Sequence, residues 1–78
     1  MARRRRGDPL QRLTDRERSV LEQMASGRSN RAIAQALSMS AKTVESHVRS
    51  IFTKLDLEEG PDEHRRVTAV VRWLNAAD

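Results

Sequence analysis

The middle of the chain, residues 29–55, carries two hydrophobic patterns with the period of an α-helix. Only Ser38, Met39 and Ser40 separate the two patterns, and a break this short fits a tight corner between two helices. The second pattern occupies positions i, i+4, i+7, i+8 and i+11 of one helical face, and we expect that face to be buried. Its members are Val44, Val48, Ile51, Phe52 and Leu55.

The opposite face of the second helix is polar and carries groups that can hydrogen-bond to base edges or to phosphates. A short corner followed by such a helix predicts a helix-turn-helix at about residues 30–49, with residues 41–55 as the helix that reads DNA. The polar stripe consists of Lys42, Glu45, Ser46, Arg49 and Thr53.

Capping signals predict a helix before this pair. Thr14, followed three residues later by Glu17, is a capping box, so a first helix should cover about residues 15–26. Gly27 stands where a left-handed residue would end that helix. The side chains expected to face the core from this segment are Leu13, Val20, Leu21 and Met24.

The remaining boundaries complete an all-α fold of four helices without strands. Ser29 is the expected N-cap of a second helix that ends at Leu37, and Ser40 is the expected N-cap of the third. After an acidic loop, a hydrophobic repeat predicts a fourth helix over about residues 63–76. The second helix should bury Ile33, Ala34 and Leu37.

Composition narrows the classes of function. A chain of 78 residues without cysteine makes one small domain that lacks disulfides and thiolate metal sites. It has no glycine-rich phosphate loop, and the adjacent Ser46 and His47 would point about 100° apart on a helix, so they form no nucleophile and base pair. We therefore expect no enzyme activity, cofactor, metal or small-molecule ligand. No apolar run approaches the ~20 residues that cross a bilayer, which favours a cytoplasmic protein without membrane contact.

Charge is segregated along the chain. The net charge is +4, and it equals the contribution of the four arginines at positions 3–6. Residues 12–55 hold eight basic and four acidic residues, whereas residues 56–63 hold five acidic residues and no basic one. Such segregation is what an electrostatic footprint on DNA requires, because phosphates meet only the face of the protein turned toward them.

The first residues show no hydrophobic periodicity. We expect residues 1–12 to be a disordered basic tail or an interdomain linker, and residues 13–78 to be the folded domain. The four arginines at positions 3–6 fit either a solvated run or a basic arm that contacts the phosphate backbone.

The residues described so far resemble the LuxR-type helix-turn-helix, the output domain of NarL/FixJ-type response regulators and of quorum-sensing regulators. The resemblance covers residues 13–57 without a gap, and the segment 64–75 resembles a variant of the family's fourth helix. It implies that helix three enters the major groove and that helix four mediates dimerisation on DNA. It also implies a position behind a phosphorylatable receiver or a ligand-binding domain. The matching residues are Leu13, Thr14, Glu17, Val20, Leu21, Gly27, Ser29, Asn30, Ile33, Ala34, Leu37, Thr43, Val44, His47, Val48, Ile51, Lys54 and Leu55.

The candidate base-reading residues are Glu45, Ser46 and Arg49. Arg49 lies on the outer face in mid-helix, and its planar fork suits a bidentate contact to guanine or a bond to phosphate. The alternative is a solvated arginine that pairs with Glu45, four residues earlier. Glu45 and Ser46 occupy positions where the LuxR-type family usually reads base edges, but many members carry a lysine where Glu45 stands. Its carboxylate should therefore either accept from a cytosine amino group or orient Arg49.

The candidate phosphate ligands are mostly polar and basic side chains near the starts of helices two and three. One further candidate is a lysine near the end of helix three. For each of them the alternative is a solvated surface side chain. His47 is expected to pack the helix corner and to have no catalytic role. The candidate phosphate ligands are Arg28, Ser29, Asn30, Arg31, Lys42, Thr43 and Lys54.

Helix four supplies the candidate dimer interface. Its hydrophobic repeat could complete the core of the domain, but Trp73 lies at the edge of that stripe and suits an interface anchor. The alternative is that Trp73 covers the core of its own domain. A homodimer would place two recognition helices about one DNA turn (~34 Å) apart, so that they read an inverted repeat. The interface candidates are Val67, Val70, Val71, Trp73 and Leu74.

The sequence thus predicts a homodimeric transcription regulator that binds double-stranded DNA sequence-specifically, with RNA polymerase as a further candidate partner. One alternative is a promoter-reading domain like that of a sigma factor. Another is a protein-interaction module that kept the fold and lost DNA affinity, for which Glu45 is the hint.

Overall fold

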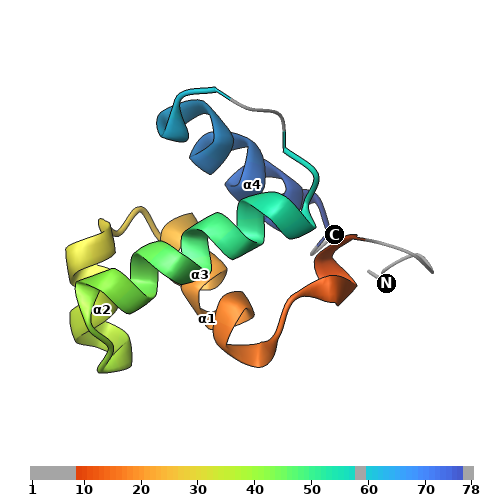
Figure 1. The fold of residues 1–78 in the computed structure, drawn as a ribbon. Coiled ribbons are helices and arrows are strands. Elements are labelled where there is room, and N and C mark those ends of the chain that lie inside the picture. Colours follow the sequence, from red (N-terminus) through yellow and green to blue (C-terminus); the bar gives the residue numbers. More distant parts are fainter. Residues whose placement is uncertain (1–8, 58–59, 77–78) are drawn as a thin grey trace.

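The computed structural model describes residues 9–57 and 60–76 (Figure 1). In these ranges the chain forms helices and no strand, which confirms the predicted all-α class, and each expected helix boundary lies within one residue of the observed one. None of the described helices combines the length and the apolar character that crossing a bilayer requires. The elements are the 3-10 helix η1 (Pro9–Arg12) and the α-helices α1 (Asp15–Ala25), α2 (Asn30–Leu37), α3 (Ala41–Lys54) and α4 (Asp62–Ala76).

The predicted N-caps are confirmed. The Thr14 hydroxyl accepts from the Glu17 N–H at 3.1 Å, and Glu17 Oε1 accepts from the Thr14 N–H at 2.8 Å, which completes the capping box. Ser29 and Ser40 each accept from the N–H three residues later, at 3.2 and 3.0 Å. These bonds satisfy donors that a helix leaves unpaired at its start.

Two left-handed residues shape the corners around α2. Gly27 follows α1 with φ +84°, a conformation that strains any side chain bearing a Cβ. Ser38 caps α2 with φ 55° and ψ 45°, and the next residue, Met39, donates its N–H to the carbonyl of Ala34 at 2.9 Å. The chain therefore turns from α2 into α3 within the three residues predicted for the corner.

The core lies between α1 and α3 and is closed by the other helices. In Figure 1, α3 runs across the domain, with α2 near its first turns and α4 near its last turns. α1 contacts each of the other α-helices, and α3 also contacts η1. The hydrophobic faces predicted for α1, α2 and α3 are buried, except that Leu37 is half-buried at the edge of the core. The buried hydrophobic residues are Leu10, Leu13, Val20, Leu21, Met24, Ile33, Ala34, Val44, Val48, Ile51, Phe52, Leu55 and Ala69.

The N-terminal boundary of the domain differs from the expectation of a tail through residue 12. Leu10 is only 2 % exposed, and its carbonyl accepts from Arg18 at 2.9 Å. Arg12 donates to the carbonyl of Lys54 at 3.1 Å and forms an ion pair with Asp56 at 3.0 Å. Residues 9–12 therefore pack on the domain, because a buried leucine and three arginine bonds hold η1 against it. The expected tail, with its four arginines, otherwise falls on residues 1–8, outside the described residues.

α4 packs through a different face from the one its hydrophobic repeat suggested for the core. Ala69 is fully buried, whereas Val67, Val71 and Leu74 are 62, 47 and 56 % exposed. Trp73 is half-buried and packs against the core of its own domain, which was the alternative to a role as an interface anchor. The small alanine allows α4 to approach its neighbours closely, which leaves the three larger side chains on the outer side.

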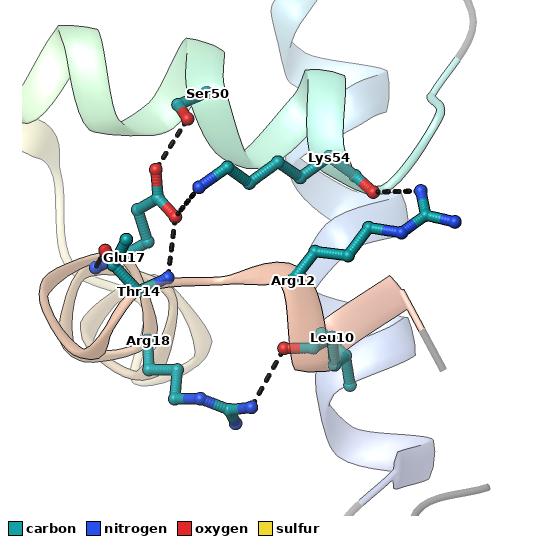
Figure 2. A network of polar contacts seen from close by, with 7 residues as sticks. All are labelled: Leu10, Arg12, Thr14, Glu17, Arg18, Ser50 and Lys54. Carbon is teal, nitrogen blue, oxygen red and sulfur yellow. Dashed lines mark hydrogen bonds and ion pairs between the residues drawn. The ribbon is translucent and has the colours of Figure 1, made fainter. Parts of the chain in front are cut away.

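A buried carboxylate links α1 to α3 (Figure 2). Glu17 is 5 % exposed, and its Oε1 accepts from Lys54 Nζ at 2.8 Å while its Oε2 accepts from the Ser50 hydroxyl. Together with the capping bond from Thr14, the carboxylate thus accepts three hydrogen bonds. The sequence pattern predicted Glu17 only as part of the cap. Its place four residues after Leu13 and three before Val20, on the core-facing stripe, was the signal for a partnered buried charge.

The surroundings of Glu17 stabilise its ionised form. Burial raises the pKa of Glu17, because water no longer solvates the carboxylate. The bonds from Lys54, Ser50 and Thr14 and the positive charge of Lys54 lower it more, so that the pKa falls from 4.5 to about 2. Because the folded-state pKa is depressed, ionised Glu17 stabilises the fold above pH 4.5, and this stabilisation is lost as the pH falls toward 2.

We expect Glu17→Gln to lower the free energy of unfolding at pH 7 by ~2 to 4 kcal/mol, because it removes the partner of the Lys54 ammonium. The difference from the parent chain should shrink as the pH falls from 4.5 toward 2. Urea unfolding followed by circular dichroism at a series of pH values measures both effects.

Glu22→Gln is the matched control, because Glu22 is an exposed carboxylate on the same helix. It should change the free energy of unfolding by less than ~0.5 kcal/mol at every pH. Equal losses of unfolding free energy in the two variants would contradict a structural role for the ionised carboxylate. A loss in Glu17→Gln that stays constant between about pH 7 and about pH 2.5 would contradict it as well.

Candidate nucleic-acid interface

The outer face of α3 presents the three residues predicted to read bases. Glu45, Ser46 and Arg49 are exposed, while Val44 and Val48 on the opposite face are buried. No ion pair joins Glu45 and Arg49 within the described residues, so the alternative in which Arg49 is occupied by Glu45 has no support in this structure. The arginine fork is therefore available to an external acceptor.

The basic side chains of the domain fall into two groups. Within the described ranges, six of them bind partners in the protein itself, through carbonyls, carboxylates, an amide or the Phe52 ring. The other five are exposed and make no hydrogen bond or ion pair within the part of the chain that the structure describes. Four of these five lie on α2, on α3 or in the turn that precedes α2. Positive charge without an internal bond is therefore concentrated in this part of the described structure. The engaged group is Arg12, Arg18, Lys54, Arg65, Arg66 and Arg72, and the unengaged group is Arg16, Arg28, Arg31, Lys42 and Arg49.

The start of α2 gathers four predicted phosphate ligands. Arg28, Ser29 and Arg31 are exposed, and Asn30 is half-buried. The Oδ1 atom of Asn30 accepts from Arg66 on α4 at 2.7 Å. This contact was not predicted, because nothing in the sequence of α4 indicates which element Arg66 faces.

The start of α3 presents two further predicted ligands. Lys42 and Thr43 are exposed, and the Ser40 hydroxyl donates to Thr43 Oγ1 at 2.9 Å. Because a hydroxyl can accept one bond and donate another, Thr43 can still donate to an anion. The unpaired N–H groups of the first turn add to the attraction for negative charge.

Lys54 differs from the prediction that made it a phosphate ligand. Its Nζ atom is bonded to Glu17 Oε1 at 2.8 Å, and its side chain is 32 % exposed. An ammonium committed to a buried carboxylate is not a free cation, so the structure assigns Lys54 to holding α3 on α1.

A hollow of about 250 Å³ lies beside the base-reading face. It is bordered by α3, by the first residue of α2 and by the first residue of α4. His47, half-buried on α3, is not part of its lining. No group of three or more potential metal ligands occurs among the described residues. The lining residues are Asn30, Glu45, Val48, Arg49, Phe52 and Asp62.

The geometry agrees with a comparison against protein families. The profile described as "Bacterial regulatory proteins, luxR family" matches residues 11–63, which is more than half of the chain. The chain belongs to this family. As a LuxR-type domain with response-regulator relatives, it is assigned to DNA-binding regulation of transcription. The match begins within η1, in agreement with the packing of that element on the domain.

Curated relatives of this LuxR-type domain include several response regulators. A nitrate/nitrite response regulator protein homolog of Haemophilus influenzae is 43% identical over 67 residues, which are 86% of this chain and 29% of the relative. The nitrate/nitrite response regulator protein NarP of Escherichia coli is 39% identical over 67 residues, covering 86% and 28% of the two chains. The oxygen regulatory protein NreC of Staphylococcus haemolyticus is 46% identical over 55 residues, covering 70% and 25%. The chain thus spans less than a third of the length of these relatives. No solved structure matches it.

We expect Lys54→Met to lower the free energy of unfolding by ~2 to 4 kcal/mol, because it leaves the buried Glu17 carboxylate without its cation. Lys42→Met removes the same charge from an exposed site and should leave stability unchanged within ~0.5 kcal/mol. In DNA titrations at several salt concentrations, Lys42→Met should reduce the slope of log K against log salt by about 1, whereas Lys54→Met should not change it. The reverse pattern would restore Lys54 as a phosphate ligand.

Proposed function

We propose that this LuxR-type domain binds DNA sequence-specifically, with α3 in the major groove. The observation that carries the proposal is the distribution of its cations: the basic side chains that make no bond within residues 9–57 and 60–76 concentrate on the helix-turn-helix. A surface of unpaired, exposed arginine and lysine side chains supplies the sequence-independent attraction to phosphates. The exposed face of α3 supplies donors and acceptors for base edges.

Within this surface, Arg49 is the proposed guanine or phosphate contact, because its fork is exposed and pairs with no carboxylate among the described residues. Glu45 lies one turn earlier on the same face. Since a carboxylate is repelled by phosphates but accepts from the cytosine amino group, the position of Glu45 favours reading of a cytosine. Ser46 completes the proposed base-reading set. The phosphate contacts are proposed for Arg28, Ser29, Asn30, Arg31, Lys42 and Thr43.

We infer a homodimer on an inverted repeat, formed through α4. Val67, Val71 and Leu74 fall at i, i+4 and i+7, and each is about half or more exposed. Exposed large apolar residues in one stripe favour a protein contact, and a two-fold axis makes the same stripe serve both copies. Val70 and Trp73 lie on the side that packs against the core and would border the contact.

The relatives named as response regulators support a wider proposal. This domain would be the output module of a longer cytoplasmic regulator, in which a preceding domain controls access to DNA and RNA polymerase is a partner at the promoter. A promoter-reading domain like that of a sigma factor is the alternative function, and failure to bind core RNA polymerase would exclude it.

Selection of bound duplexes from a random pool should enrich an inverted repeat whose half-sites are about one turn apart. On the selected duplex, Arg49→Ala should weaken binding by ~1 to 3 kcal/mol and relax selectivity at one base pair. Fluorescence anisotropy titrations with the selected duplex and with single-base variants measure both effects.

Arg16→Ala is the matched control, since Arg16 is an exposed, unengaged arginine on α1, outside the helix-turn-helix. It should change affinity by less than ~0.5 kcal/mol. Enrichment of nothing beyond salt-sensitive background would contradict sequence-specific binding and favour the protein-interaction module.

Leu74→Glu and Val71→Glu should abolish two-copy binding to the inverted repeat, because a charge cannot enter an apolar contact unpaired. Binding to an isolated half-site should remain within twofold of the parent domain. Thr68→Glu is the control, because Thr68 is exposed on the same helix but outside the stripe. Gel-shift stoichiometry distinguishes one bound copy from two, and unchanged two-copy binding by both stripe variants would exclude α4 as the interface.

A further inference from the structure

The guanidinium of Arg66 joins α4 to the corner that precedes α2. Its Nη1 atom donates to Asn30 Oδ1 at 2.7 Å, and its Nη2 atom donates to the carbonyl oxygen of Arg28 at 2.8 Å. The two acceptors flank Ser29, the N-cap of α2. One planar fork thus fixes a side chain and a backbone group on both sides of this cap.

Arg66 is half-buried, and its bond to Asn30 is partly shielded from water, whereas its bond to the Arg28 carbonyl is exposed. Burial lowers the pKa of Arg66. An arginine nevertheless stays protonated in proteins, so its fork consists of donors only. A cation at this position also adds positive charge behind the first turn of α2.

The bond from Arg66 determines which end of the Asn30 amide is occupied. An asparagine side chain has an oxygen that accepts and an NH₂ group that donates, and its neighbours decide its orientation. Because a guanidinium can bind only the oxygen, the flipped amide would place donors against donors. The contact therefore selects the rotamer in which both amide N–H groups are left for another acceptor.

We propose that Arg66 is a positioning residue for DNA binding: it orients the Asn30 amide so that the N–H groups meet a backbone phosphate. The inference rests on the proposed function, since it assigns a phosphate to the start of α2. It also adds a link between two parts of the surface. Val67, next to Arg66, belongs to the exposed stripe of α4, so a second copy seated on that stripe would hold the helix that orients Asn30.

The test is a double-mutant cycle on the selected duplex, measured at a temperature where circular dichroism shows every variant to be folded. Arg66→Ala and Asn30→Ala should each raise the dissociation constant about tenfold. The dissociation constant of the double variant should lie within about twofold of that of the weaker-binding single variant, because both changes remove the same phosphate contact. Arg66→Lys, which keeps the charge but loses the fork, should fall between the parent and Arg66→Ala.

Asn30→Asp separates positioning from a merely structural role. An aspartate keeps an acceptor for Arg66, so the melting temperature should equal or exceed that of the parent domain. The same change replaces the N–H donors by a carboxylate that repels phosphate, so DNA affinity should fall more than tenfold. If the corner served only stability, Asn30→Asp would bind DNA as well as the parent domain.

Arg16→Ala serves again as the control for loss of one positive charge, with an expected change below twofold. If the parent domain binds the duplex and Arg66→Ala changes the dissociation constant by less than about twofold, the positioning role is overturned and the proposed function is left intact. Independent effects of Arg66→Ala and Asn30→Ala, which multiply in the double variant, would also overturn it. Failure of the parent domain to select any duplex would instead overturn the proposed function, and this inference with it.

Discussion

The buried carboxylate of Glu17 is the interaction on which the position of α3 depends. It begins as a helix cap for α1, and the same group then accepts bonds from Ser50 and Lys54 near the end of α3. A buried charge destabilises a fold unless it is paired and hydrogen-bonded. The fold therefore favours the rotation of α3 about its axis, and the position along that axis, at which Ser50 and Lys54 reach the carboxylate. With that rotation, the face that carries Arg49 points away from the core. Glu17, a capping residue of α1, thereby helps to set the orientation of the proposed recognition helix α3.

The same constraint explains how a domain with balanced charge can present a basic surface. Apart from the arginines at positions 3–6, the sequence has equal numbers of basic and acidic residues. The structure uses many of its cations internally: Arg12, Arg18 and Arg72 each donate to a backbone carbonyl, and Lys54 binds Glu17. The cations that remain outside lie mainly on α2, α3 and the turn before α2. Net charge therefore says less about this protein than which charges are left unpaired.

Local signals made most of the fold predictable from the sequence. The helices, their serine and threonine caps and the left-handed Gly27 depend on neighbours within four residues, and all were found. η1 was missed because four residues carry no periodicity. The partners of Glu17 were missed because Ser50 and Lys54 lie 33 and 37 residues away in sequence, and the partner of Asn30 was missed because Arg66 lies 36 residues away. On α4 the repeat of large side chains was recognised, but the packed face centres on the small Ala69, which hydrophobicity alone does not single out.

Chemical-shift mapping of the domain with its selected duplex is the most direct test of α3 as the recognition helix, because it locates the DNA-facing surface without any substitution. We expect the largest backbone amide shifts at residues 28–31 and on the outer face of α3, at Lys42, Glu45, Ser46 and Arg49. Amides near Leu10 and Asp56, at the opposite end of α3, should shift little. Shifts concentrated at that end, or spread evenly over the domain, would contradict the assignment of α3 as the helix that enters the groove.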